Sequence, residues 1–254
     1  FYLNLNIYLY TINMNSNVVS SFTVKRLISD IKEIKKNPLS KEEIYYKHDE
    51  SDMLYGYALI IGPENTPYAH GYFLFKFNFP YDYPHSPPTV TYHTNDGYTR
   101  FHPNLYKNGK VCVSILNTWK GEQWTGCQTI RSILLSLCSL FNQNPLINEP
   151  GIAITHKDII PYNKIIKYKT ISVAINKILT KDLLYFPKYF EVFNDEIINY
   201  FIKNYDKIKK TIENELTNSE DNKIITTNTY GLSIKINYDR AYQRLQRHYN
   251  NLNE

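Results

Sequence analysis

Of the three cysteines in this sequence, Cys112 is the one whose setting suits chemistry. It stands eight residues after Asn104, beyond an Asn108-Gly109 turn, in a segment bounded by polar residues. A thiolate is both a good nucleophile and a good leaving group, so a thiol suits a site that carries an acyl group as a reactive ester. No imidazole or cation lies next to Cys112 in the sequence, which favours an acyl acceptor over a protease nucleophile.

Asn104 is the second candidate of this segment. When an amine attacks a thioester, the carbonyl oxygen becomes an oxyanion that needs a fixed hydrogen-bond donor, and a side-chain amide can supply one. Gly109 permits the positive φ that an Asn-Gly turn requires before the segment that carries Cys112.

A wider set of motifs surrounds these two residues. The triplet His102-Pro103-Asn104 precedes Cys112, Trp119 and Trp124 follow it, and a proline-rich segment, Tyr83-Pro84-His85-Ser86-Pro87-Pro88, lies upstream. Together they resemble the core of ubiquitin-conjugating enzymes, which hold ubiquitin as a thioester.

The resemblance extends over residues 24–179 and implies roles for the matching residues. Cys112 would carry the thioester, Asn104 would stabilise the oxyanion or order its loop, and His102 would brace that loop. The implied partners are ubiquitin or a ubiquitin-like protein, an activating enzyme that consumes ATP, a ubiquitin ligase and a substrate protein. No bound cofactor or metal is implied.

The side that receives the substrate lysine departs from the family pattern. Asn144 stands where many members carry an Asp that orients and deprotonates the lysine, and an amide cannot take that proton. Ser114 also stands where an Asp is common. Glu149 and Asp158 are weak candidates to compensate, so transfer to lysine is expected to be slow or to depend on a partner.

The partner-facing segments are expected from the same resemblance. A basic face on the first helix, formed by Lys25, Arg26 and Lys32, corresponds to the docking position for the activating enzyme. The ligase-facing loops differ from the family pattern at His85 and at Gly126 and Cys127, which leaves the ligase class open. Cys127 is read as a small residue at a loop–helix junction rather than as a redox-sensitive thiol.

Residue periodicity predicts the elements that position these groups. Apolar residues at helical spacing predict helices from Ser20 to before Pro38, over 130–141 and over 162–179. Alternation predicts strands over 43–47, 54–61, 72–79 and 89–93, of which the third places four phenylalanines on one face. The order implies an α+β fold, a four-stranded antiparallel meander with helices on one side, which is the ubiquitin-conjugating fold.

A helical extension follows this core. Apolar stripes predict one helix over 190–212 and another over 238–252, separated by a polar loop over 217–229, and packing on the core or on each other is the favoured account of both stripes. The chain therefore divides into an N-terminal segment (1–19), a core (20–179) and an extension (180–254). The extension, the four extra residues between Cys112 and Trp124 and the segment 148–151 resemble the large Z-type branch. The first methionine is Met14, so residues 1–13 are expected to precede the native start.

Composition limits the classes of protein to which this chain can belong. Of the 254 residues 43% are hydrophobic and 21% charged, which allows a sizeable core, and a net charge of +5 without a basic stripe argues against nucleic acid. Three cysteines without metal spacing, and apolar runs too short to span a bilayer, favour the cytoplasm, with the nucleus also open. The alternative to an active enzyme is a non-catalytic variant that binds ubiquitin or a ligase, but such variants typically lack the cysteine.

Overall fold

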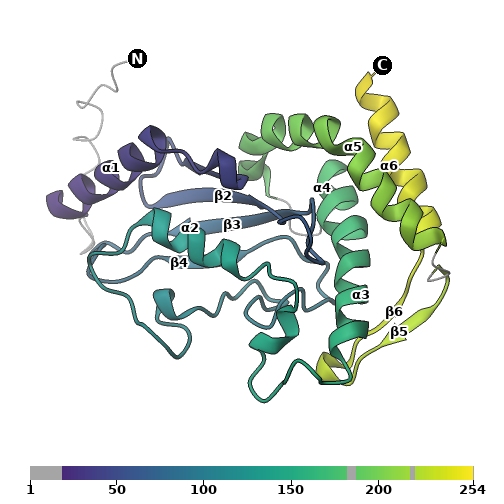
Figure 1. Cartoon of the computed structure of the whole chain (residues 1–254). Coiled ribbons are helices and arrows are strands. Elements are labelled where there is room, and N and C mark those ends of the chain that lie inside the picture. Colours follow the sequence, from purple (N-terminus) through teal and green to yellow (C-terminus); the bar gives the residue numbers. More distant parts are fainter. Residues whose placement is uncertain (1–18, 182–186, 218–220, 254) are drawn as a thin grey trace.

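The computed structural model describes residues 19–181, 187–217 and 221–253 (Figure 1). Nearly all of the predicted N-terminal segment, including Met14, therefore lies outside the described residues. The first helix, α1 (Ser21–Lys36), begins where the Ser20 hydroxyl accepts a hydrogen bond from the Thr23 amide at 3.0 Å. It ends before Pro38 and buries Leu27 and Ile34, as the sequence predicted.

The four predicted strands are confirmed. They are β1 (Ile44–His48), β2 (Tyr55–Ile61), β3 (Tyr72–Asn78) and β4 (Thr89–Tyr92), paired antiparallel in the order β1-β2-β3-β4. In the register Phe75 lies opposite Ala58 on one side and Tyr92 on the other. The sheet is thus the predicted meander.

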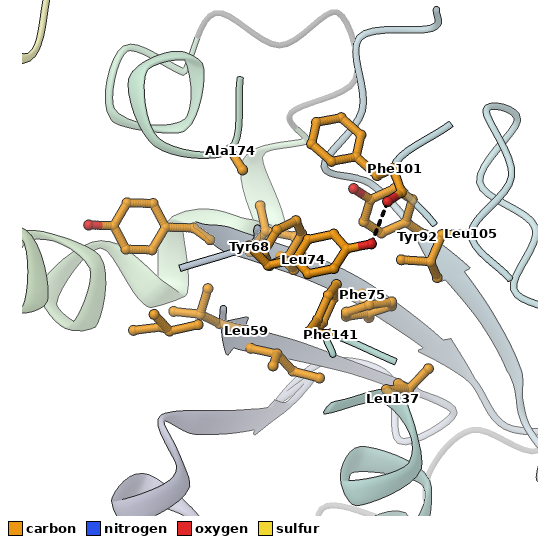
Figure 2. Close-up of a cluster of buried hydrophobic side chains, with 14 of the residues drawn as sticks. Leu59, Tyr68, Leu74, Phe75, Tyr92, Phe101, Leu105, Leu137, Phe141 and Ala174 are labelled. Carbon is orange, nitrogen blue, oxygen red and sulfur yellow. Dashed lines mark hydrogen bonds between the residues drawn. The ribbon is translucent and has the colours of Figure 1, made fainter. Parts of the chain in front are cut away.

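One face of the sheet packs against α2 (Ile130–Ser139) and the residues that follow it. The ring of Phe141 stacks on Phe73 with centroids 4.3 Å apart. Figure 2 shows Phe75 and Phe141 together, with Leu137 of α2 nearby. The hydroxyl of Tyr68 reaches from this core to the Phe101 carbonyl at 2.6 Å, drawn as the dashed line in Figure 2.

The opposite face of the sheet is also covered, so the expectation of helices on one side only is wrong. Tyr57 stacks on Tyr189 at 4.7 Å, and Tyr72 meets Tyr200 edge-on at 6.2 Å. These partners belong to η6 (Lys188–Phe193) and α5 (Asn194–Thr217). β3 is apolar at successive positions, the pattern of a strand buried on both faces.

A long helical segment joins the sheet to the extension. It comprises α3 (Ile159–Lys169), a π-helical stretch η5 (Thr170–Ile175) and α4 (Asn176–Leu179), which together cover the helix predicted over 162–179. Figure 1 shows this segment standing beside the sheet, between the sheet and α6.

The extension contains an element that the sequence did not predict. Within and after the expected polar loop lie β5 (Ile224–Thr226) and β6 (Ser233–Lys235), which pair as a hairpin across the short turn η7 (Thr229–Gly231). The last helix, α6 (Tyr238–Asn253), packs on α5, where Tyr249 stacks on Tyr205 at 3.8 Å. Three further short turns complete the described elements: η2 (Ser40–Glu42), η3 (Ser114–Leu116) and η4 (Pro145–Asn148).

Candidate functional site

Cys112 lies in an extended segment immediately before η3. Its backbone N–H donates to the Asn104 carbonyl at 2.9 Å, and the neighbouring Val111 forms a bridge with Leu105. The residue is only 2% exposed. Little of Cys112 is therefore in contact with solvent in the free protein.

The side-chain amide of Asn104 is directed at the Cys112 backbone. Nδ2 donates to the Cys112 carbonyl at 2.5 Å, so Asn104 and Cys112 exchange two hydrogen bonds. Oδ1 accepts from Nδ2 of Asn148 at 3.5 Å, the long end of the hydrogen-bond range. The contacts of Asn104 thus order the segment that carries the thiol.

His102 is buried beneath the same loop. Its Nδ1 accepts a hydrogen bond from the backbone N–H of Asn104 at 3.0 Å. Burial, assisted by the charge of Arg100, lowers the pKa of His102 to about 3, so the imidazole is neutral near pH 7. The side chain can hold the loop but is not placed to exchange protons with solvent.

The backbone before His102 is fixed from the core. Tyr68 donates to the Phe101 carbonyl, and Tyr162 of α3 donates to the Arg100 carbonyl at 2.7 Å. Arg100 in turn donates through Nη2 to the Pro103 carbonyl at 2.5 Å. Sequence reasoning did not single out Arg100, because its partners are backbone oxygens that carry no sequence signal.

The Asn108-Gly109 turn returns the chain towards β4. Gly109 has φ +87°, and a Cβ there would lie 2.9 Å from the Tyr92 carbonyl oxygen. The Tyr92 amide donates to the Gly109 carbonyl at 2.7 Å. Glycine is required here both by the positive φ and by the close approach of β4.

A cleft of about 400 Å³ opens beside the cysteine segment. Ser114 and Asn104 both line it, so the structure brings these two predicted residues together. Its walls are neutral, and they are formed by Asn104, Val113, Ser114, Ile115, Trp119, Ser136, Ser139, Leu140 and Asn148. Asn148 is a site residue that the sequence did not indicate, because it comes 44 residues after its partner Asn104.

The two carboxylates expected to compensate on the acceptor side are occupied elsewhere. Glu149 accepts a hydrogen bond from the Tyr230 hydroxyl, and Asp158 accepts from the Thr229 N–H and hydroxyl, both at 2.7 Å. Burial favours a higher pKa for Asp158, but these bonds hold that pKa below its usual range. Both candidates thus already have hydrogen-bond partners in the free protein, and Oδ1 of Asn144 accepts from Asn163 at 3.3 Å.

The predicted basic face of α1 divides into two kinds of residue. Lys25 and Lys32 are exposed. Arg26 instead donates to Asp30 at 2.9 Å, to the Gly126 carbonyl at 2.6 Å and to the Gln128 carbonyl. Arg26 is therefore bound within the chain, whereas its part in a docking surface stays a prediction.

The remaining candidates lie on the same side of the fold as α1. His85 is exposed and stacks on Phe22 of α1 with ring centroids 5.7 Å apart. Cys127 is exposed, whereas Cys138 packs half-buried against the core, and burial raises the pKa of its thiol.

Among residues 19–181, 187–217 and 221–253, no three His, Cys, Asp or Glu side chains are grouped as metal ligands would be. Over the same ranges, no helix combines the length and the apolarity that crossing a bilayer requires.

The chain is similar in sequence to known proteins. The family model described as "Ubiquitin-conjugating enzyme" matches residues 26–170, more than half of the chain. "Ubiquitin-conjugating enzyme E2 Z" of Xenopus tropicalis is 44% identical over 163 residues, which cover 63% of this chain and 51% of that protein.

Two human proteins are similarly related. The human "Ubiquitin-conjugating enzyme E2 Z" is 45% identical over 153 residues, 59% of this chain and 43% of the relative. "Dual E2 ubiquitin-conjugating enzyme/E3 ubiquitin-protein ligase BIRC6" is 45% identical over 118 residues, 44% of this chain and 2% of that protein. The chain spans about half the length of the first two relatives.

Proposed function

Because the chain belongs to the ubiquitin-conjugating enzyme family, whose members are transferases that carry ubiquitin as a thioester, we propose that Cys112 accepts ubiquitin or a ubiquitin-like modifier. An activating enzyme, which consumes ATP, delivers the modifier as its own thioester. The Cys112 thiolate attacks the thioester carbonyl carbon, and the thiolate of the activating enzyme leaves. The single observation that carries this proposal is the exchange of two hydrogen bonds between Asn104 and Cys112 at the family's spacing.

Transfer to the substrate is the second step, and a ligase assists it. The uncharged amine of a substrate lysine attacks the same carbonyl carbon, and the resulting oxyanion collapses to expel the Cys112 thiolate. The amine must lose its proton, yet Asn144 and Ser114 carry no carboxylate, and Glu149 is bound to Tyr230. Proton removal therefore falls to solvent, a ligase or the substrate itself.

The loop residues support this step by position. The Asn104 side chain donates to the Cys112 carbonyl, and His102 accepts from the backbone N–H of Asn104. Both residues therefore order the segment that carries the thiol in the free enzyme. We assign loop ordering to Asn104, because one of its two side-chain N–H donors is bonded to the Cys112 carbonyl in the free enzyme.

Two surfaces serve the partners in this proposal. Exposed Lys25 and Lys32 on α1 dock the activating enzyme, and exposed His85 and Cys127 contact the ligase. The free thiols suit the cytoplasm or nucleus, where cysteines stay reduced.

The second candidate function is a non-catalytic variant that binds ubiquitin or a ligase. The chain retains Cys112 and the hydrogen bonds between Asn104 and Cys112. This favours the enzyme, because a scaffold needs neither. Only the enzyme forms a bond to the modifier that a thiol reductant breaks.

Incubation with activating enzyme, ATP and ubiquitin, followed by gels with and without reductant, tests the proposal. Wild type should give a reductant-labile adduct, and Cys112→Ser should give a more stable oxyester. Cys127→Ser and Cys138→Ser are matched controls that should still charge. An adduct that persists in Cys112→Ala would refute the assignment of the acceptor, and the absence of any adduct in wild type would favour the scaffold.

A further inference from the structure

The turn of the C-terminal hairpin contacts both flanks of the loop that holds Asn104. Tyr230, at the centre of η7, adopts φ 64° and ψ 3°, a left-handed conformation that non-glycine residues rarely occupy. Its ring faces the Arg100 guanidinium, and its hydroxyl reaches Glu149. A residue 126 positions after Asn104 (230 − 104) thereby contacts the active-site scaffold.

The first contact acts through Arg100. The guanidinium carbon lies 3.5 Å from the ring centroid of Tyr106 and 4.9 Å from that of Tyr230, so both aromatic rings are within cation–π distance of it. The same guanidinium donates to the carbonyls of Pro103, at 2.5 Å, and His102, at 3.3 Å. Two rings that fix its plane also fix the two peptide groups immediately before Asn104.

The second contact acts through Glu149. The carboxylate accepts the Tyr230 hydroxyl, and the preceding residue, Asn148, donates its side-chain amide to Oδ1 of Asn104 at 3.5 Å. A charged acceptor makes the first of these bonds the stronger one. The turn therefore restrains Asn104 from its backbone side and from its side-chain side.

The turn itself is anchored independently of Tyr230. Asp158, at the start of α3, accepts both the N–H and the hydroxyl of Thr229 at 2.7 Å. A change of the Tyr230 side chain thus leaves a second attachment that keeps the hairpin against α3.

We propose that Tyr230 is a positioning residue for transfer from Cys112, acting through Arg100 and Glu149 on Asn104. This inference rests on the proposed carrier function. It gives the extension a task in the chemistry besides covering the sheet.

The test compares matched tyrosines. Tyr242 of α6 also donates its hydroxyl to a glutamate, Glu213 at 3.1 Å, but in an exposed pair between α5 and α6. Tyr230→Phe removes the bond to Glu149 and keeps the ring over Arg100, whereas Tyr230→Leu removes both. Tyr242→Phe and Tyr242→Leu make the same chemical changes at the control position.

The first readout is single-turnover discharge of the preformed thioester at increasing lysine concentration. We expect the maximal rate to fall about threefold in Tyr230→Phe and about tenfold in Tyr230→Leu, the latter equivalent to about 1.4 kcal/mol. The half-saturating lysine concentration should stay constant, and the Tyr242 variants should match wild type. A purely structural role would lower the unfolding midpoint of the Tyr230 variants and leave this maximal rate unchanged.

The second readout needs no modifier. The side-chain NH₂ resonances of Asn104 in the nitrogen–proton spectrum of the free protein should shift in both Tyr230 variants and stay in place in both Tyr242 variants. If Tyr230→Leu does not fold, Tyr230→Phe still provides both measurements.

The outcomes separate the two proposals. A wild-type protein that never charges on Cys112 overturns the carrier function, and this is seen before any Tyr230 variant is compared. A wild type that charges, together with Tyr230 variants that discharge like their Tyr242 counterparts or leave the Asn104 resonances unmoved, overturns the positioning role alone.

Discussion

Arg26 donates a hydrogen bond to the carbonyl oxygen of Gly126 at 2.6 Å and so ties α1 to the loop before α2. The family resemblance predicts different partners for these two residues, the activating enzyme for Arg26 and the ligase for Gly126. The guanidinium also pairs with Asp30, which accepts the Tyr83 hydroxyl at 2.5 Å. A polar network that includes the buried Asp30 and Tyr83 therefore links the helix of one proposed docking surface to the loop of the other.

This network predicts different effects for neighbouring basic residues. Lys25→Glu should raise the concentration of protein that half-saturates the activating enzyme, more strongly at low salt, and should leave the free energy of unfolding within about 0.5 kcal/mol. Arg26→Glu should lower that free energy by about 2–4 kcal/mol, because it replaces the cationic partner of the buried Asp30 carboxylate with a second negative charge. Charging kinetics and urea unfolding measure the two effects. Salt-independent kinetics for Lys25→Glu would remove Lys25 from the docking surface.

Asn104 provides a second prediction. If its amide orders the loop, Asn104→Ala should slow charging and discharge by similar factors and lower the free energy of unfolding by about 1–3 kcal/mol, since the Cys112 carbonyl loses its partner. Asn108→Ala is a suitable control, because Asn108 bonds only within its own turn, to the Lys110 amide. A loss confined to discharge, on the order of 10²–10³, would instead identify Asn104 as an oxyanion donor.

The third prediction is that the absence of a carboxylate at position 144 limits the rate of transfer to lysine. Asn144→Asp should accelerate discharge to free lysine, and more so as the pH falls, because a carboxylate helps most where the uncharged amine is scarce. Gln143→Glu places the same charge one residue away on an exposed side chain and should have little effect. Single-turnover discharge measured from about pH 6.5 to about pH 8.5 gives the difference between the variants. Fast wild-type discharge that Asn144→Asp leaves unchanged would show that the missing acid is not limiting.

The lowered pKa of His102 predicts that the free energy of unfolding depends on pH. Burial lowers its pKa to about 3 in the folded protein, whereas an unfolded histidine titrates near about 6.5. Below that pH the unfolded state binds the extra proton, so stability is lost as the pH falls from about 6.5 towards 3, by at most about 1.4 kcal/mol per unit. The slope of unfolding free energy against pH should be shallower in His102→Gln. Equal slopes would mean that His102 is protonated in the fold.

Periodicity predicted the main elements of the fold but not how the extension meets the core. The strands and the helices α1, α2, α5 and α6 repeat apolar residues over three or more positions, which a single sequence displays directly. The hairpin β5–β6 has three-residue strands within a polar stretch and offers no such repeat. Packing of the extension's apolar stripes on the core or on each other was predicted, but not the sheet face that they cover, because a sequence pattern does not show which segment covers which face.

The candidate site divides in the same way. Cys112, Asn104 and His102 lie within eleven residues (102–112), so their motif fixes their proximity. The partners of Glu149 and Asp158 are 81 and 71 residues away, and Arg26 meets Gly126 across 100 residues. Contacts of that separation depend on tertiary packing, and a charged side chain considered alone looks available for chemistry when it is already bound.

The two-sided burial of the sheet has a consequence for attempts to shorten the protein. A chain cut after the family-matched segment would lose η6 and α5 and uncover Tyr57 and Tyr72, which are 5% and 0% exposed in the intact fold. It would also leave the Glu149 carboxylate without Tyr230. An aromatic sheet face of that kind favours self-association in water. The smallest soluble unit of this protein should therefore be larger than the segment that defines its family.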